Sequence, residues 1–252
     1  MTHFTRGSGE GGWGAARADL AGWAVERVVG PAERLHRLGV PDTPRRLLRW
    51  CRAAAPALVL GSAQPDAHVD HAAAAAAGLT VVRRRSGGSS VVVGPGRVAW
   101  LDVVVPAGDP LWEDDVGVAP LWLGRTWADA LRALGVRDAT VHQGAMRRTR
   151  WSPHVCFAGT GPGEVATAQG KVVGISQRRT RAAALFQCGV LWRWDPLEAV
   201  SALAVDRVRA ALELRDAAVG LADLVGGPVS DDVIEAAFAD AVHTAVPSRS
   251  IA

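Results

Sequence analysis

The chain has 252 residues, 49% of them hydrophobic and 21% charged, which is typical of soluble globular proteins. Its net charge of +3 is mild and its arginines are dispersed, so it lacks the dense basic stripe of a nucleic-acid-binding protein. Three cysteines argue against a disulfide framework, and neither a signal-peptide pattern nor a membrane-length apolar stretch occurs. We therefore expect a cytoplasmic protein that binds neither nucleic acid nor a membrane.

The first third of the chain is expected to contain two helices and one short strand. Residues 1–14 are rich in Gly and small polar residues, which predicts disorder. Residues 15–29 are predicted as a helix, and the apolar run 57–60 as a buried strand. The Ala-rich residues 66–77 are predicted as a second helix, with Gly78 in the position of a helix C-terminal glycine.

Two blocks of β-strands follow, separated by a helix predicted over residues 121–134. The first block has strands over 80–84 and 98–105, with a polar Gly/Ser loop at 86–90 between them. The second block contains a hairpin with a tight turn at Gln169-Gly170. Its predicted strands cover residues 155–158, 165–168, 171–177 and 183–194.

Two helices, near residues 197–213 and 230–245, are expected to close the chain. Ser230 is a good N-cap for the second of them. One face of that helix carries apolar residues at four-residue spacing, which are Ile234, Phe238 and Val242.

The order of these elements predicts the fold class. Because the regular βαβ alternation of a doubly wound sheet is missing, we expect an α+β fold with a mixed, largely antiparallel sheet flanked by helices. We expect a disordered N-terminus (1–14), a catalytic domain (15–195) and C-terminal helices (196–252) that are packed on that domain or appended to it.

The segment 83–90, Arg-Arg-Arg-Ser-Gly-Gly-Ser-Ser, is the first candidate for chemistry. A Gly-Gly pair after a strand lets the backbone approach a ligand closely, and its N–H groups could hold an acyl carbonyl or a phosphate. The adjacent arginines offer bidentate contacts to phosphate. Gly/Ser loops are common, so this motif alone favours an ordinary hairpin loop.

Lys171 is the second candidate, because it is the only lysine in the chain. A lysine at the start of a strand can point into a cleft and neutralise a developing negative charge. A surface lysine beside a turn is the alternative. Since arginine fills every other basic position and the two side chains are not interchangeable at a site for a compact cation, we infer that this lysine has a chemical role.

Cys156 is the third candidate, since a thiolate can accept an acyl group as a thioester. A small buried hydrophobic residue is an equally good interpretation of it. Cys51, placed in a helical stretch, and Cys188, in an apolar strand, are predicted to be structural. His68 and His71 are spaced i,i+3 with no third ligand, so we interpret them as surface residues and expect no metal site.

Taken together, two motifs resemble those of the lipoate-protein ligase and octanoyltransferase superfamily, which is related to the biotin ligase catalytic domain. The motifs are Arg-Arg-x-Ser-Gly-Gly at 83–88 and Gly-Lys-x-x-Gly-x-x-Gln-x-Arg at 170–179, and residues 185–191 are similar to the family segment Leu-Gln-His-Gly-Ser/Thr-Leu. The resemblance implies catalysis by Lys171 and substrate binding by Arg84, Ser86, Gly87, Gly88, Gly174, Gln177 and Arg179.

The resemblance also implies the fold and the reaction. The fold would be that of the class II biotin and lipoate ligases, with a lipoyl or octanoyl chain in an apolar tunnel beside the Gly-Gly loop. Lys171 would contact the acyl carbonyl or an acyl-adenylate. The acceptor would be a lysine on a lipoyl domain or on the glycine-cleavage carrier protein.

The chain departs from the ligase pattern in three places. Ligases usually have His-Asp where this chain has Val93-Gly94, Gly-Asn where it has Gly96-Arg97, and an Asn-Asp pair ahead of the lysine. By contrast, Cys156 lies fifteen residues before Lys171, and Glu164 seven before it. That spacing resembles octanoyltransferases that use a cysteine nucleophile.

Three functions remain open at this point, and we favour the first slightly. The first is lipoate ligation with ATP and Mg²⁺, in which Arg84 and the Gly87-Gly88 pair hold the adenylate. The second is octanoyl transfer from acyl carrier protein through Cys156, with no cofactor and with Lys171 polarising the thioester carbonyl. The third is a non-catalytic homologue that binds the acyl chain.

Overall fold

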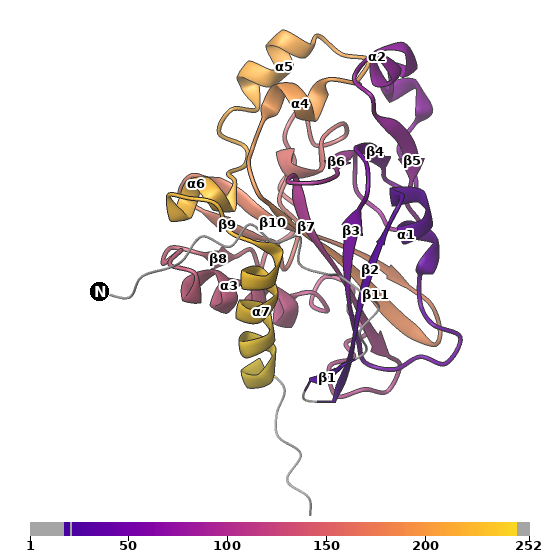
Figure 1. Ribbon diagram of the computed structural model, residues 1–252, viewed down its shortest axis with the longest axis vertical. Coiled ribbons are helices and arrows are strands. Elements are labelled where there is room, and N and C mark those ends of the chain that lie inside the picture. The colour runs from indigo at the N-terminus through magenta and orange to yellow at the C-terminus, as the bar shows by residue number, and fades with distance from the viewer. Residues whose placement is uncertain (1–17, 21, 246–252) are drawn as a thin grey trace, which may run out of the picture.

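The computed structural model describes residues 18–20 and 22–245 (Figure 1), so the disorder expected for residues 1–14 lies outside the described residues. Eight strands form one sheet in the order β1-β2-β3-β7-β11-β10-β9-β8. They are β1 (Ala18–Leu20), β2 (Trp23–Gly30), β3 (Leu47–Ala53), β7 (Val98–Pro106), β8 (Thr140–Val141), β9 (Val165–Thr167), β10 (Gly170–Arg179) and β11 (Ala183–Leu191). Only β2 and β3 pair in parallel in this sheet, within the described residues.

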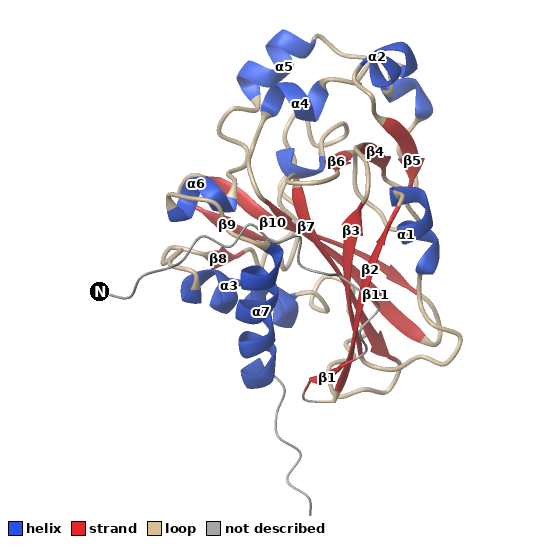
Figure 2. Cartoon of the chain, in the orientation of Figure 1, coloured by secondary structure: helices blue, strands red, loops and turns tan. Residues whose placement is uncertain are grey.

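A second, smaller sheet has the order β5-β4-β6 and packs with helices at one end of the molecule (Figure 2). Its strands are β4 (Ala57–Leu60), β5 (Thr80–Arg83) and β6 (Val91–Val93). The helices are α1 (Ala32–Leu38), α2 (His71–Ala76), α3 (Leu121–Ala133), α4 (Pro196–Val200), α5 (Arg207–Glu213), α6 (Leu221–Val225) and α7 (Asp231–Ala245). The α+β class and the mixed, largely antiparallel sheet expected from the sequence are confirmed.

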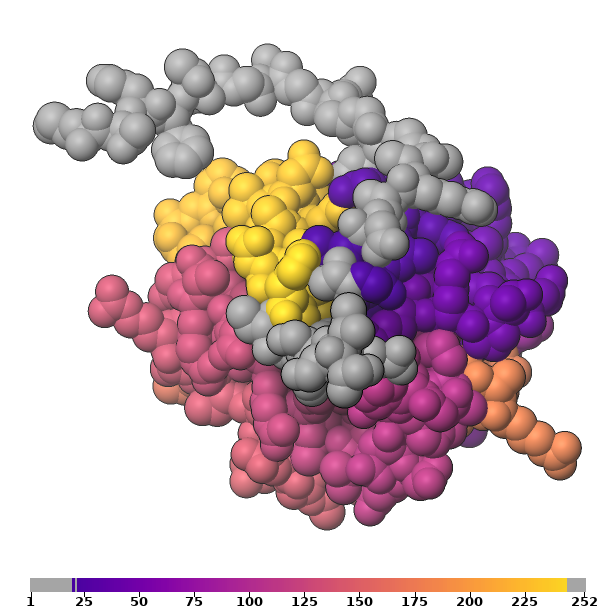
Figure 3. Space-filling view, turned by 90° about the horizontal axis from the view of Figure 1, so that it is seen from below, coloured from indigo at the N-terminus to yellow at the C-terminus, as the bar shows by residue number. Residues whose placement is uncertain are grey.

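The main core lies between the large sheet and helices α3 and α7. Phe238 of α7 is fully buried against Trp127 of α3, with 4.4 Å between ring centroids, and meets Trp50 of β3 edge-on. Figure 3 shows α7 (yellow) packed between the N-terminal strands (indigo) and the middle of the chain (magenta). The apolar face of α7 expected from the sequence is confirmed, as is its cap, because Val233 N donates to Ser230 Oγ at 3.3 Å.

The helix predicted over residues 15–29 is wrong, because the described part of this segment forms β1 and β2. Residues 23–30 are rich in Val, whose branched Cβ favours strands, and Trp23 and Val25 alternate inward. The partner of β2 is β3, which pairs with it in parallel. Cys51 therefore lies in a strand and not in a helix, although it is buried as expected.

Two other elements also differ from expectation. Residues 156–158 form a single 3-10 turn and not a strand, so Cys156 lies on a loop that bridges to Ser90. The helix expected over 197–213 is divided into α4 and α5, because Asp206 begins a new helix by accepting from Arg209 N. No helix of the described part of the chain is both long and apolar enough to cross a membrane.

Candidate active site

The Gly-Gly loop is held in shape by Arg84, which is 5% exposed. Its guanidinium donates to the carbonyl of Gly87 at 2.8 Å and to that of Ser89 at 3.0 Å. Gly88 has φ of +94°, a left-handed conformation that favours glycine, and a Cβ at Gly61 would lie 1.7 Å from the Gly88 oxygen. The loop conformation thus depends on glycine at positions 88 and 61 and on the buried Arg84.

Ser86 connects this loop to the large sheet. Its hydroxyl donates to Gln187 Oε1 at 2.7 Å and accepts from the hydroxyl of Ser176 at 3.0 Å. The amide nitrogen of Gln187 lies 3.1 Å from Asp102 Oδ1 and 3.3 Å from His36 Nδ1. Residues of β7, β10, β11, α1 and the loop therefore form one polar network, of which Ser86 alone was predicted as a site residue.

The network contains two ionisable groups with altered pKa values. Burial raises the pKa of Asp102 to about 6, although Trp100 and Gln187 donate hydrogen bonds to it. Burial, together with the charge of Arg84, lowers the pKa of His36 to about 3. His36 is therefore a neutral imidazole at pH 7.

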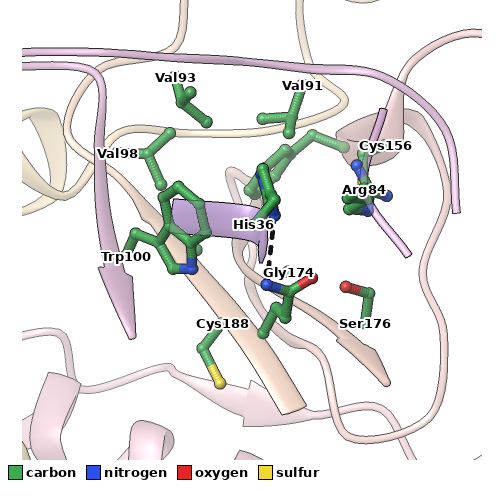
Figure 4. Close-up of a pocket in the computed structure, with 13 residues that line it drawn as sticks. His36, Arg84, Val91, Val93, Val98, Trp100, Cys156, Gly174, Ser176 and Cys188 are labelled. Carbon is green, nitrogen blue, oxygen red and sulfur yellow. Dashed lines mark hydrogen bonds between the residues drawn. The ribbon is translucent and has the colours of Figure 1, made fainter. Parts of the chain in front are cut away.

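An apolar pocket lies beside the network, between the small sheet and the large one. It has an atom-free volume of about 470 Å³, part of which is open to solvent. Trp100 and Val98 lie at one end, and Arg84 and Cys156 lie side by side at the other (Figure 4). Gly174 lines the pocket, and a Cβ at this position would lie 3.3 Å from the Phe157 ring. The remaining lining residues are His36, Val91, Val93, Phe157, Ser176, Gln187, Cys188 and Gly189.

A larger, more polar cleft adjoins this pocket, with an atom-free volume of about 1230 Å³. Gly87 and Gly88 line it, together with Met146, Arg148 and Glu164. Among the described residues, Cys156 and Ser176 alone line both cavities. The Ser176 hydroxyl is engaged with Ser86, whereas the Cys156 sulfur lies beside Gly88, 3.8 Å from a Cβ built there.

Lys171 is buried behind Cys156, with only 2% of its side chain exposed. Its ammonium donates to the carbonyls of Cys156 and Gly159, each at 2.9 Å, and to Glu164 Oε2 at 2.7 Å. These are all three of its donors. The loop that carries Cys156 therefore wraps around this cation, which lies near both cavities without lining either.

Glu164 completes this arrangement. Its spacing of seven residues from Lys171 resembles the octanoyltransferase pattern but indicates no role for it. One carboxylate oxygen accepts from Gly161 N at 2.6 Å and the other from Ile175 N at 3.1 Å. A buried charge is tolerated only when it is paired and hydrogen-bonded, and each member of the Glu164–Lys171 pair meets this condition.

The side chains of Gln177 and Arg179 are both engaged with a neighbouring loop. Gln177 lines the polar cleft but donates to the carbonyl of Val116. Arg179 donates to the carbonyl of Asp114 at 2.9 Å, and its guanidinium stacks 4.2 Å from the centroid of Trp112. Both side chains fasten the loop over residues 112–116, and Arg179 lines neither cavity.

The three cysteines, all free, differ in their surroundings. Burial raises the pKa of Cys51 well above its ordinary value, and that of Cys188 to about 12. Both thiols stay protonated near neutral pH. Cys156 is the only one that is partly exposed.

This fold and this site define an enzyme of the ligase or transferase type. The model of the family described as the lipoyl protein ligase A/B catalytic domain matches residues 32–243. The chain therefore belongs to this family. Among curated protein sequences, none matches the chain.

Solved structures of similar fold agree with the family. Lipoate-protein ligase A bound with ATP has a TM-score of 0.67 and 18% identity, over 88% of this chain and 84% of its own. A bipartite lipoate protein ligase from Thermoplasma acidophilum, described with its E2 lipoyl domain, has a TM-score of 0.62 and 17% identity, over 88% and 84%. P. falciparum LipL1 in complex with lipoate has a TM-score of 0.61 and 11% identity, over 88% and 61%.

Proposed function

We propose that this enzyme transfers an octanoyl group to a lysine of a carrier protein through a thioester on Cys156. The position of Cys156 carries the proposal, because its side chain lies where the apolar pocket meets the polar cleft. An acyl chain held in the pocket would present its carbonyl to this sulfur, while donor and acceptor groups would enter through the cleft.

The reaction consists of two acyl transfers. The Cys156 sulfur attacks the carbonyl of a donor thioester, the donor C–S bond breaks, and the donor thiol leaves with the proton of Cys156. The acceptor amine then attacks the acyl-enzyme, forming a C–N bond as the C–Sγ bond breaks, and the proton lost by the amine returns to the thiol. No oxidant, reductant or nucleotide is consumed.

Groups of the chain are placed to support both transfers. Negative charge develops on the carbonyl oxygen at each attack, and backbone N–H groups aimed at that oxygen stabilise it. The N–H groups of Gly87 and Gly88 border the cleft beside Cys156 and have no acceptor among the described residues. The Lys171 ammonium donates a hydrogen bond to the Cys156 carbonyl, which fixes the backbone of the nucleophile.

ATP-dependent lipoate ligation is the second candidate, favoured by the size of the polar cleft and by Arg148 on its wall. Of the residues assigned to the adenylate, Arg84 does not fit that role. Arg84 uses its N–H groups on backbone carbonyls, and Val93, where ligases have His, lines the apolar pocket. We therefore derive no step through ATP.

The decisive experiment is the intact mass of the enzyme after incubation with octanoyl-acyl carrier protein. We expect one hydroxylamine-sensitive octanoyl adduct, absent from Cys156→Ser, and its transfer to the lysine of a lipoyl domain. A parallel reaction with lipoate, ATP and Mg²⁺ monitors pyrophosphate release. Carrier modification only in this second reaction would establish ligation instead, and octanoate binding without any modification would establish a binding homologue.

The setting of the reaction follows from the same chemistry. A catalytic thiol must stay reduced, and all three cysteines of the chain are free. We therefore expect the enzyme to act in the cytoplasm, on a lipoyl domain or on the glycine-cleavage carrier protein.

A further inference from the structure

The loop over residues 142–150, here called the rim loop, borders the mouth of the polar cleft. Met146 and Arg148 line the same cleft as Cys156. Any protein that brings a lysine to the Cys156 thioester through this cleft must therefore approach or cover the rim loop. The chemistry of its exposed side chains then determines which partners fit.

The rim loop is firmly attached to the nucleophile loop. The backbones of Arg147 and Thr160 exchange two hydrogen bonds, of 2.8 and 3.0 Å, and Thr149 Oγ1 donates to Ala158 O at 2.8 Å. Met146 packs over the glycines beneath it, since a Cβ at Gly159 would lie 2.7 Å from its terminal methyl carbon. The rim loop thus presents its side chains from a fixed backbone.

Two arginines of the rim loop carry unneutralised charge. Arg147 and Arg148 are exposed, and neither forms an ion pair with any residue that the structure describes. Their neighbour Arg150 differs, because it lies 3.8 Å from Glu213 and 5.1 Å from the centroid of Trp151. Met146, beside the unpaired pair, is 41% exposed and offers an apolar contact.

We propose that the rim loop is the docking surface for the acceptor carrier domain, and that it selects a domain with carboxylates flanking its target lysine. A lysine ammonium approaching Arg147 and Arg148 is repelled unless acidic neighbours engage the two guanidinium groups. This inference rests on the proposed function, but the acceptor is the partner that thioester transfer and ATP-dependent ligation share. We assign the surface to the acceptor because either mechanism needs this partner, and the test below separates it from the acyl donor.

The test is steady-state transfer to a lipoyl domain by the Arg147→Glu/Arg148→Glu variant. We expect kcat/KM for the carrier to fall on the order of tenfold at low ionic strength, with kcat at saturating carrier unchanged. Acylation of Cys156 by a small octanoyl thioester should be unaffected by Arg147→Glu alone, because Arg147 does not line the cleft. Arg181→Glu, which reverses an exposed arginine at the β10–β11 turn, is the matched control and should behave like the wild type.

Two further measurements make the test specific. Raising the salt concentration should reduce the difference between the variant and the wild type, because screening weakens surface charge effects. For an acceptor domain that has acidic residues beside its target lysine, changing these residues to arginine should restore transfer by the variant and abolish transfer by the wild type.

Each adverse outcome has a distinct meaning. Unchanged kcat/KM and salt dependence in the variant would overturn the docking surface while leaving Cys156 chemistry intact. Slower acylation by octanoyl-acyl carrier protein with normal transfer to the lipoyl domain would assign the surface to the donor, which also overturns the proposal. If wild-type enzyme forms no Cys156 adduct, the thioester mechanism fails, and the variant is then assayed with lipoate and ATP.

Discussion

At the scale of single residues, the site depends on one buried pair of charges. Lys171 and Glu164 are 2% and 6% exposed, so water contributes little to stabilising either group. The ammonium has three acceptors, and the carboxylate accepts from two backbone N–H groups besides the lysine. Removing one partner leaves the other charged, buried and uncompensated, which costs far more than losing an exposed pair.

Glu164→Gln should therefore destabilise the protein by about 3 kcal/mol. The change keeps the size of the side chain, removes its charge and turns one acceptor oxygen into an amide donor. Urea denaturation of both proteins measures the difference. Asp129→Asn, which breaks the exposed Arg132–Asp129 pair, is the control and should cost less than about 1 kcal/mol. Equal small effects of the two substitutions would show that the buried pair carries no special stability.

His36 makes stability depend on pH. Its pKa is about 3 in the folded protein against an ordinary 6.5, so between these values the unfolded chain binds more protons and stability rises with pH. Asp102 acts in the opposite direction between its ordinary 3.8 and about 6, because its folded pKa is raised. The shift of His36 is the larger of the two, so we expect a net loss of stability on acidification from pH 7 to pH 5.

Thermal unfolding of the wild type and of His36→Leu across this range tests the assignment. The variant should lose less stability than the wild type on acidification, and the opposing contribution of Asp102 should then dominate. An identical pH dependence in the two proteins would mean that folding does not shift the pKa of His36.

At the scale of elements, β10 supports the loop before α3 through two side chains. Gln177 and Arg179 lie two residues apart, so they share a face of the strand, and both donate to carbonyls of residues 113–116. The family resemblance assigned substrate binding to both. The structure gives Arg179 a position that holds a loop, away from both cavities.

Arg179→Ala should free the loop over residues 112–116 with little effect on acylation of Cys156. The guanidinium supplies hydrogen bonds to this loop and stacks on Trp112, so its loss should speed amide hydrogen exchange there. Arg181→Ala serves as the control. A raised KM for the acyl donor with unchanged exchange would support the substrate-binding role instead.

The elements also show what local sequence can predict. The β9–β10 hairpin is predicted correctly, because its two arms are adjacent in the chain and the Gln169-Gly170 turn joins them. The strand β2 was missed because its parallel partner β3 lies beyond α1, and no short-range periodicity reports such a pairing. The turn at Cys156 was predicted as a strand because Val155, Cys156 and Phe157 are individually good strand residues.

At the scale of the whole molecule, the site is assembled from segments that are distant in sequence. The Gly-Gly loop, Cys156 and Lys171 could be predicted, because motif spacing preserves them. His36, Asp102 and the contacts of Lys171 with the nucleophile loop could not, because they arise only when α1, β7 and the loop meet. Arg84 is buried and holds the Gly-Gly loop in shape, a structural role that the residues beside it in the sequence do not indicate.

The two sheets together set the size of the acyl pocket. Val91 and Val93 of the small sheet face Val98 and Trp100 of the large one across it, and Gly174 lies along its wall. A Cβ at Gly174 would lie 3.3 Å from the Phe157 ring, so a larger side chain there would displace this ring, which lines the pocket. The length of acyl chain that the enzyme accepts should therefore depend on this residue.

Gly174→Val should shift the preference of the enzyme towards shorter acyl chains. We expect the rate of Cys156 acylation to fall by about tenfold or more for an octanoyl thioester and much less for a butanoyl thioester, since a filled pocket loses the burial of several methylene groups. The ratio of the two kcat/KM values is the measurement, because a general loss of folding would lower both alike. If the ratio stays constant, the acyl chain does not lie in this pocket. The position of Cys156 at the end of the pocket is then no evidence for a catalytic role.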